Sequence, residues 1–552
     1  MLISKNENFV LPQGWSKCCL PDFTNIVMGQ SPTSDTYNKN RNGIPFFQGK
    51  AEFGAIYPTV VKYCSAPNKI AFAGATLLSV RAPVGPTNLA KEKCCIGRGL
   101  AAIHPADGIS SMFVLLLLRS IETDISKEGT GSTFSAINKQ FVEELEFGLP
   151  PLPEQHRIVA KIEELFSELD KGIENLKTAQ AQLKVYRQAL LKHAFEGKLT
   201  AQWREQNRDQ LETAAALQMR IQQERAQRYQ QQLAEWESKS PSVPLLQRGK
   251  ATSVVTPLTV PHFEKGGLGG ISKPKTPKPL PPLTAEELAE LPALPEGWGW
   301  VRPQDICSPK PYSIGIGPFG SNLKVSDYRK SGVPLIFVKN ITRSNFFLDL
   351  KYIDEIKYRE LVPHSVNALD LLITKMGDPP GDCEIYPARA PNAVLTADCL
   401  KFRLWEKFAN RTLYKFCINS NFVKRQLGLI TKGVAQKKIS VERFKTVCLP
   451  FFSVEEQQVL VQEIEAKLSE VDQLDQTIST SLQQAEALRQ SILKKAFSGK
   501  LVPQDPHDEP ASELLARIKA ERATVAAKPR KNPTSDKLSP VEIAPSPMSK
   551  ES

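Results

Sequence analysis

The chain has 552 residues, which is enough for several domains with ordinary hydrophobic cores. Its 71 Lys and Arg residues exceed its 59 Asp and Glu residues, and the net charge of +12 permits contact with a polyanion. No apolar run is long enough for a signal peptide or a membrane-spanning helix, so we expect a cytoplasmic protein without membrane contact. The ten cysteines have no CxxC spacing, which favours free thiols over a zinc site.

Residues 1–153 are expected to form a mixed α/β domain. Short apolar runs at residues 44–48 and 76–81 predict strands, and scattered glycines mark turns between them. A polar glycine segment, residues 128–133, precedes the end of this domain. The proline-rich residues 149–153 are expected to stop regular structure, so that a long helix begins near Glu154.

That helix belongs to a stretch that occurs twice. From Glu154-Gln155 onwards, the first copy matches the second with a shift of 302 positions, and both end in Ala-Phe-x-Gly-Lys-Leu. Seven of nine positions in each copy, spaced alternately by four and three residues, are apolar, which is typical of a coiled-coil seam. Because burying one large aliphatic side chain contributes roughly 1.5–3 kcal/mol, we expect the two helices to pair with each other. The predicted seam consists of Ile162, Phe166, Leu169, Ile173, Leu176, Leu183 and Leu190 in the first copy and Ile464, Leu468, Val471, Ile478, Leu482 and Ile492 in the second.

The rest of the chain repeats the plan of its beginning. Leu-Pro-Glu-Gly-Trp at residues 294–298 matches Leu-Pro-Gln-Gly-Trp at residues 11–15, and a polar glycine segment recurs at 431–438, although the two domains otherwise differ. Residues 220–225 resemble residues 517–522, so the repeat extends past the long helices. The expected order after the first domain is a coiled-coil helix at 154–200, a helical extension at 201–240, a basic Pro/Gly-rich linker at 241–291, a second domain at 292–453, a second coiled-coil helix at 454–500, and a tail at 501–552 with one short helix and a mostly disordered end.

Motifs that would indicate catalysis are incomplete. Residues 315–320 formally match GxGxxG, but Pro318 interrupts the turn and no clear helix pattern follows. Asp378-Pro379-Pro380 is similar to a motif of amino-methyltransferases, but Gly381 stands where the aromatic residue should be. The chain has no Walker loop, and its six histidines form no cluster visible in sequence. We therefore expect no catalytic residues, no metal and no cofactor in this chain. Two other interpretations stay open: a self-contained DNA methyltransferase and a coiled-coil scaffold without a DNA role.

Several stretches resemble the specificity subunit of Type I restriction–modification enzymes, along nearly the whole chain. The most specific are Leu-Pro-Pro-Leu-Pro-Glu-Gln at 149–155 and the Ala-Phe-x-Gly-Lys-Leu ending of both helices. The second copy departs at residues 451–453, Phe-Phe-Ser, which replace Pro-Leu-Pro. Other matching stretches are residues 29–32, 45–54, 78–85, 96–103 and 317–324.

The resemblance implies an α+β fold in which two target recognition domains are joined by two long helices that pair as an antiparallel coiled coil with pseudo-twofold symmetry. Each domain would read one half of a bipartite site in double-stranded DNA. The chain itself would be non-catalytic. Two modification subunits would bring S-adenosylmethionine for adenine methylation, and restriction/translocase subunits would use ATP and Mg. From Ile162 to Leu190 the helix has 29 residues, or roughly 43 Å, close to one DNA turn.

We expect DNA contacts from exposed loop cations and polar side chains. Arg and Gln can make bidentate contacts to base edges, whereas Lys more often binds phosphate. The candidates are Gln30, Ser31, Gln48, Lys50, Arg81 and Arg98 in the first domain and Ser321, Lys324, Lys339, Lys375, Gln436, Lys437 and Lys438 in the second.

Overall fold

The computed structural model describes residues 10–128, 136–239, 282–377, 380–431 and 438–527. It divides into two compact units, the first made of residues 1–178 and 478–552 and the second of residues 179–477. Residues 129–133 and 432–437 of the two polar glycine segments, with Gln436 and Lys437, most of the predicted linker and most of the predicted disordered end lie outside the described residues.

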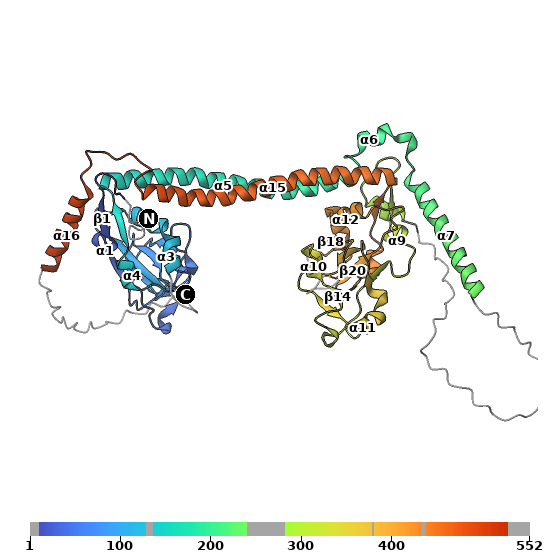
Figure 1. Ribbon diagram of the computed structural model, residues 1–552, viewed down its shortest axis with the longest axis horizontal. Helices are drawn as coiled ribbons and strands as arrows, with labels where there is room; N and C mark the ends of the chain where they lie inside the picture. The colour runs from blue at the N-terminus through green and yellow to red at the C-terminus, as the bar shows by residue number, and fades with distance from the viewer. Residues whose placement is uncertain (1–9, 129–135, 240–281, 378–379, 432–437, 528–552) are drawn as a thin grey trace, which may run out of the picture. The chain divides into compact units, whose positions relative to one another are not determined.

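The first unit contains three antiparallel or mixed sheets (Figure 1). A two-stranded sheet closes the domain and leads into the long helix; it pairs β1 (Ser16–Cys19) with β11 (Glu146–Leu149). The second sheet has the order β2-β10-β7-β8, with bounds Thr24–Met28, Leu100–Pro105, Thr76–Ser79 and Thr87–Leu89. The third has the order β3-β5-β4-β9-β6, with bounds Tyr37–Asn38, Tyr63–Cys64, Ile44–Phe47, Cys94–Ile96 and Ile70–Ala71.

Short helices complete the core of this unit. The helix α2 (Ser111–Ser120) buries six consecutive apolar residues from Phe113 to Leu118, which include the longest aliphatic run of the sequence, Val114 to Leu118. It begins at Ser110, whose side chain accepts a hydrogen bond from the backbone N–H of Phe113. The remaining helices of the domain are α1 (Leu20–Phe23), α3 (Glu122–Glu128) and α4 (Lys139–Glu143).

The second unit repeats these sheets, except that β3 has no counterpart among its named strands. A two-stranded sheet of β12 (Gly299–Val301) and β21 (Leu449–Phe451) closes the domain. The order β13-β20-β17-β18 reproduces β2-β10-β7-β8, with bounds Ile314–Ile316, Cys399–Phe402, Leu371–Thr374 and Cys383–Ile385. The order β15-β14-β19-β16 reproduces β5-β4-β9-β6, including one parallel pair in each, with bounds Lys351–Ile353, Val333–Ile336, Ala393–Leu395 and Ser365–Val366. Two domains that differ in sequence therefore share one topology.

The helices of the second domain differ more from those of the first. Two helices, α12 and α13, stand where the first domain has α2 and α3, and buried residues of both join the core around β17 and β20. The described helices in this domain are α8 (Ala285–Ala289), α9 (Pro303–Ile306), α10 (Val338–Thr342), α11 (Glu355–Glu360), α12 (Arg411–Asn419), α13 (Asn421–Leu429) and α14 (Val441–Phe444).

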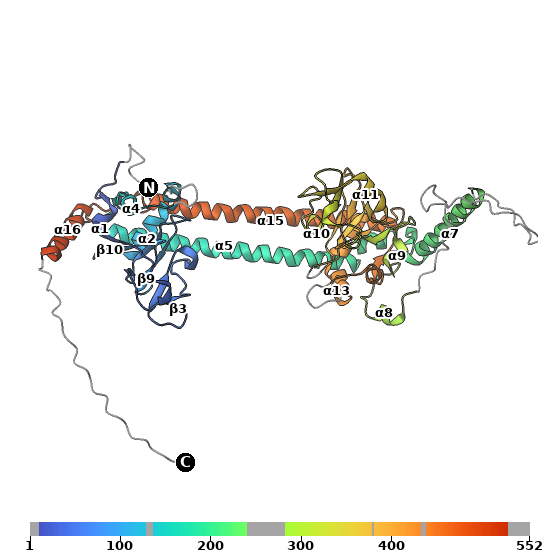
Figure 2. The same ribbon diagram turned by 90° about the horizontal axis from the view of Figure 1, so that it is seen from below.

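The two long helices, α5 (Leu152–Phe195) and α15 (Val454–Ala496), each contribute one part to each unit (Figure 2). In both units they run antiparallel: Asp170 pairs with Arg489 in the first, and Arg187 with Asp472 in the second. Every predicted seam residue is buried or half-buried, and the positions between them are mostly exposed. The predicted fold class, two mixed α/β domains with long paired helices, is confirmed.

The first long helix starts within two residues of Glu154, near which the sequence places it. The helix α5 already includes Leu152 and Pro153. A proline is tolerated in the first helical turn because the backbone N–H that it lacks would have no partner inside the helix. The proline-rich stretch therefore ends the domain but does not delay the helix.

Each long helix is followed by a second helix that returns to a domain. The predicted single extension at 201–240 is divided into α6 (Ala201–Gln206), a short 3-10 turn (Arg208–Gln210) and α7 (Ala214–Lys239), whereas α16 (Ala511–Ala527) follows α15 after a plain loop. Within the second unit, Arg225 of α7 donates to the carbonyls of Gln304 and Cys307. Within the first, Arg522 of α16 donates to the carbonyls of Pro21 and Thr24, which occupy the equivalent positions.

Among the described helices, none is both long enough and apolar enough to cross a lipid bilayer.

Candidate nucleic-acid interface

Four loops of the first domain meet around the turn that joins β9 to β10. They are this turn and the loops that follow β2, β4 and β7, and we call the surface that they form the edge of the domain. The backbone N–H of Gly97 donates to the carbonyl of Phe47 at 2.8 Å, and that of Val80 donates to the carbonyl of Gly99 at 2.9 Å. The loop after β2 joins them, because the N–H of Gly29 donates to the carbonyl of Leu100 at 2.8 Å. Segments far apart in sequence are therefore fixed side by side by their own backbones.

Glycine is required for this close approach. A Cβ atom at Gly29 would lie 2.1 Å from the carbonyl oxygen of Gly97, and one at Gly99 would lie 2.4 Å from that of Gln48. Both distances are far below van der Waals contact with a rigid backbone atom. Any larger residue would push the loops apart.

Four predicted DNA contacts come together on this edge. The hydroxyl oxygen of Ser31 accepts hydrogen bonds from the side-chain amide of Gln48 and from the backbone N–H of Arg98, both at 3.3 Å. The side chains of Gln30, Gln48 and Arg98 are exposed. The edge therefore presents two amides and one guanidinium, all groups that can bond to base edges.

The other two candidates of the first domain lie at the margin of the edge. Lys50 is exposed and opens a short 3-10 turn, Lys50–Glu52, directly after the loop that holds Gln48. Arg81 is exposed and follows β7, where it forms an isolated bridge with Ala136.

The second domain builds the same edge with other residues. The N–H of Thr396 donates to the carbonyl of Ile336 at 3.0 Å, that of Lys375 to Asp398 at 2.8 Å, and that of Gly317 to Cys399 at 3.4 Å. These three bonds correspond one by one to the three backbone bonds of the first domain. A fourth pair agrees as well, since Ile439 donates to Lys375 in one domain and Ile137 to Val80 in the other.

The predicted contacts of the second domain are more dispersed. Ser321 and Lys324 are exposed on the loop after β13. Lys339, at the start of α10, has its amine 3.3 Å from the carboxylate of Asp349.

Two further lysines lie beside the turn between β19 and β20. The amine of Lys375 donates to the carbonyl of Ala397 at 3.4 Å, and that of Lys438 lies 3.9 Å from the carboxylate of Asp398. Sequence reasoning missed Asp398, because a lone acidic residue gives no signal until the strands place it between two lysines.

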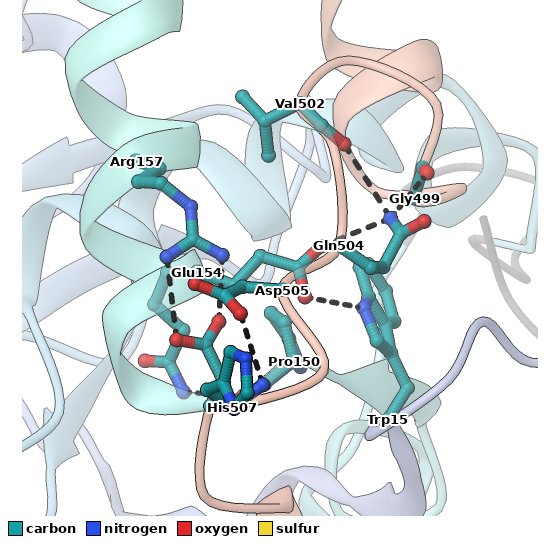
Figure 3. Close-up of polar contacts among 11 residues, drawn as sticks. Trp15, Pro150, Glu154, Arg157, Gly499, Val502, Gln504, Asp505 and His507 are labelled. Atoms are coloured by element: carbon teal, nitrogen blue, oxygen red, sulfur yellow. Dashed lines mark hydrogen bonds and ion pairs between the residues drawn. The ribbon is translucent and has the colours of Figure 1, made fainter.

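Each domain is attached to the helix pair through a buried glutamate. In the first unit, one carboxylate oxygen of Glu154 accepts from the indole N–H of Trp15 at 3.0 Å, and the other accepts from the amide of Gln504 at 3.2 Å (Figure 3). Burial raises the pKa of the Glu154 carboxyl. On the next turn of α5, Arg157 forms a 2.6 Å ion pair with Asp508 of the tail (Figure 3).

The equivalent glutamate of the second unit has stronger donors. One carboxylate oxygen of Glu456 accepts from the hydroxyl of Thr200 at 2.7 Å and from the guanidinium of Arg204 at 2.8 Å. The other accepts from the indole of Trp298 at 2.9 Å. The following residue also acts alike in both units: Gln155 donates to the carbonyl of Pro150, and Gln457 to that of Phe452. Both helices therefore start in the same way. These contacts match Pro150 with Phe452, so Phe-Phe-Ser at 451–453 occupies the place of Leu-Pro-Pro at 149–151 and not, as the sequence suggested, that of Pro-Leu-Pro.

Known proteins match this chain over different lengths. Residues 12–178 match the family model "Type I restriction modification DNA specificity domain". A putative type I restriction enzyme MjaX specificity subunit from Methanocaldococcus jannaschii is 38% identical over 35% of this chain and 46% of that protein. The type I restriction enzyme EcoDI specificity subunit from Escherichia coli is 22% identical over 76% of this chain and 78% of that protein.

This chain is therefore similar to specificity subunits of Type I restriction–modification enzymes, and residues 12–178 match their DNA specificity domain. A crystal structure of the HsdS subunit from Thermoanaerobacter tengcongensis is 45% identical over 35% of this chain and 47% of that chain, with a TM-score of 0.29. The chain thus spans about half the length of this subunit and of the Methanocaldococcus relative.

Two features of residues 10–128, 136–239, 282–377, 380–431 and 438–527 could indicate catalysis, namely groups of metal ligands and a buried lysine. There, no three His, Cys, Asp or Glu residues are grouped so that they could hold a metal ion. Burial lowers the pKa of Lys401 to about 8, which in an open pocket would suit a nucleophile. Its amine is instead enclosed and donates to the carbonyls of Pro363 and Ser365, so it holds the domain together.

Proposed function

We propose that this chain is the non-catalytic, DNA-reading subunit of a Type I restriction–modification complex. Each of its two domains reads one half of a bipartite site in double-stranded DNA, and the subunit thereby directs adenine methylation and restriction. The observation that carries the proposal is the repeated edge: the same four loops are joined by the same backbone bonds in both domains, but they carry different side chains. Such an arrangement can hold one reading geometry while changing the sequence that is read.

The chemistry of the edge supports a division of labour among its residues. In the first domain, Gln30, Gln48 and Arg98 can reach base edges as hydrogen-bond donors, whereas Lys50 and Arg81 at the margin suit phosphates. In the second, Ser321 can reach bases, and the lysines at 324, 339, 375 and 438 suit phosphates. Gln436 and Lys437, which precede Lys438 in the chain, remain candidates from sequence.

The long helices would serve the partners of this subunit. Their outward faces carry exposed charges, among them Glu163, Glu164, Lys177 and Lys184. We propose that two modification subunits dock on these faces and bring S-adenosylmethionine, and that restriction/translocase subunits with ATP and Mg join that assembly in the cytoplasm. The continuous helices would also fix the distance between the two half-sites.

The proposed function is tested by mapping methylated adenines in cells that carry this subunit with its modification partner. We expect methylation at one bipartite motif, and none without this chain. Methylation by the isolated chain would favour a self-contained methyltransferase. The absence of any motif, together with no binding of duplex DNA by the assembled complex, would favour a scaffold.

The same assay tests the division of labour. Arg98→Ala should relax one position of the first half-site, whereas Lys50→Ala should lower methylation of all sites and flatten the dependence of binding on salt.

Inserting one heptad into both α5 and α15 should change the spacer between the half-sites. An unchanged spacer after both insertions would contradict the role of the helices as a ruler.

A further inference from the structure

The central turn of the edge carries opposite charges in the two domains. In the first domain it is Gly97-Arg98-Gly99, between β9 and β10, and in the second it is Thr396-Ala397-Asp398, between β19 and β20. The backbone bonds described above match Gly97 with Thr396 and Gly99 with Asp398. Each turn therefore has one charged side chain at the centre of its edge, cationic in the first domain and anionic in the second.

The acidic side chain is not buried by its surroundings. The side chain of Asp398 is 45% exposed, and the amine of Lys438 lies 3.9 Å from its carboxylate, the one ion pair recorded for Asp398 among the described residues. The amine of Lys375 points to a backbone carbonyl, that of Ala397, and not to this carboxylate. Among the described residues, the second carboxylate oxygen of Asp398 has no recorded ion pair, so it can accept a hydrogen bond from a ligand at the edge.

A carboxylate at this position can make few kinds of contact with DNA. It repels phosphate, so it cannot serve as a backbone contact. In the major groove, however, the exposed amino group of cytosine is a hydrogen-bond donor that Asp and Glu can accept. Arg98 at the matching turn has the opposite preference, because guanine presents two acceptors to a guanidinium.

We propose that Asp398 is a specificity-determining residue that accepts a hydrogen bond from the amino group of a cytosine in the second half-site. This inference rests on the proposed function, and it specifies which residue reads which base in which half-site. The second half-site must then contain at least one C·G pair. The competing role for Asp398 is only to orient Lys438, in which case the carboxylate would carry no base preference.

The test compares methylated motifs in cells that express the modification partner with the wild-type chain or with Asp398→Ala, Asp398→Asn or Lys438→Ala. Asp398→Ala should reduce the preference for cytosine at one position of the second half-site by roughly tenfold or more, with the first half-site unchanged. Asn has nearly the same shape as Asp, so Asp398→Asn controls for a loss of folding. This variant should accept adenine at that position, because Asn can form hydrogen bonds with the adenine edge. Lys438→Ala should reduce methylation of all sites without changing the motif.

Three results would overturn the inference. The first is a second half-site without any C·G pair. The second is an unchanged motif in Asp398→Asn, and the third is a uniform loss in Asp398→Ala that matches Lys438→Ala. If the wild-type chain itself yields no bipartite motif, the proposed function fails, and this inference fails with it.

Discussion

The two joints between domain and helix have the same shape but different electrostatics. In the first unit, buried Glu154 accepts from the neutral side chains of Trp15 and Gln504. In the second, buried Glu456 meets a guanidinium, that of Arg204, whose central carbon also lies 5.1 Å from the ring of Trp298. An indole and a carboxylate thus define the joint, and the third partner is free to vary.

The two units differ in where the ion pair lies relative to the buried glutamate. The first unit places its ion pair one helical turn further on, between Arg157 and Asp508. The second unit places it inside the joint, where Glu456 is 2% and Arg204 16% exposed. A partly buried pair depends more strongly on both partners than one at the margin, because removing one charge leaves the other without compensation.

The largest expected effect is the loss of the carboxylate in the second unit. Glu456→Ala removes the acceptor for Thr200, Arg204 and Trp298 together, and it leaves the guanidinium desolvated. We expect the free energy of unfolding to fall by about 3–5 kcal/mol. Urea denaturation measures this loss, and hydrogen exchange assigns it to the start of α15.

The matched control is Glu154→Ala in the first unit. It also removes a buried acceptor, but both donors, Trp15 and Gln504, are neutral, so we expect a smaller loss of about 1–3 kcal/mol. Equal losses in the two variants would show that the charge of Arg204 does not matter to the joint.

A second comparison concerns the helix pair itself. In the second unit the amide of Gln180 donates to the carboxylate of Asp475 at 3.1 Å, at two positions of the heptad seam. The repeat places Ile173 and Leu482 at the corresponding positions of the first unit. A polar layer in a mainly apolar seam can fix the register of the two helices at a cost in stability.

Replacing this polar layer should therefore stabilise the second unit. We expect the double variant Gln180→Leu, Asp475→Ile to raise the free energy of unfolding by about 1–2 kcal/mol, because it converts two half-buried polar groups into an apolar contact. Thermal denaturation of the full chain measures it. A lower midpoint would indicate that the layer stabilises the pair as well as aligning it.

A smaller difference separates the two ion pairs of the coiled coil. Arg489 pairs with Asp170 and also lies with its guanidinium 4.8 Å from the ring of Phe166. Arg187 forms the equivalent pair with Asp472, but Leu468 stands in place of the phenylalanine. Since an exposed ion pair contributes little and a cation–π contact about 0.5–1 kcal/mol, Arg489→Ala should cost about that much more than Arg187→Ala.

That comparison is tested by denaturing both alanine variants under the same conditions. A double variant with Phe166→Leu should remove the difference between the two sites. If Arg187→Ala proves the more costly, stacking on Phe166 is not what separates them.

The sequence predicted the helix pair far better than the edge. A coiled-coil seam is a local pattern, so spacing alone identified residues such as Ile162 and Ile464. The edge depends on backbone bonds between distant segments, and these bonds do not require particular side chains apart from glycines such as Gly29. For this reason the common topology of the two domains was not apparent, and Asp398 went unnoticed.

The variant Glu154→Gln should change the free energy of unfolding least at neutral pH, but its effect should depend most clearly on pH. Burial raises the pKa of Glu154 above its ordinary value of 4.5, so the folded state prefers the protonated carboxyl. Its contribution to stability is fully present below the ordinary pKa and is lost as the pH rises through the raised one. A glutamine keeps the acceptor for Trp15 without a charge, so the variant should lack this loss. The free energy of unfolding of the wild-type chain, minus that of the variant, should therefore fall as pH rises from 4 and then level off. The same subtraction for Glu456→Gln should favour the wild-type chain at neutral pH, because Arg204 loses its counter-charge. A difference for Glu154→Gln that rises with pH would show that a neighbouring charge, such as Arg157, outweighs burial at this joint.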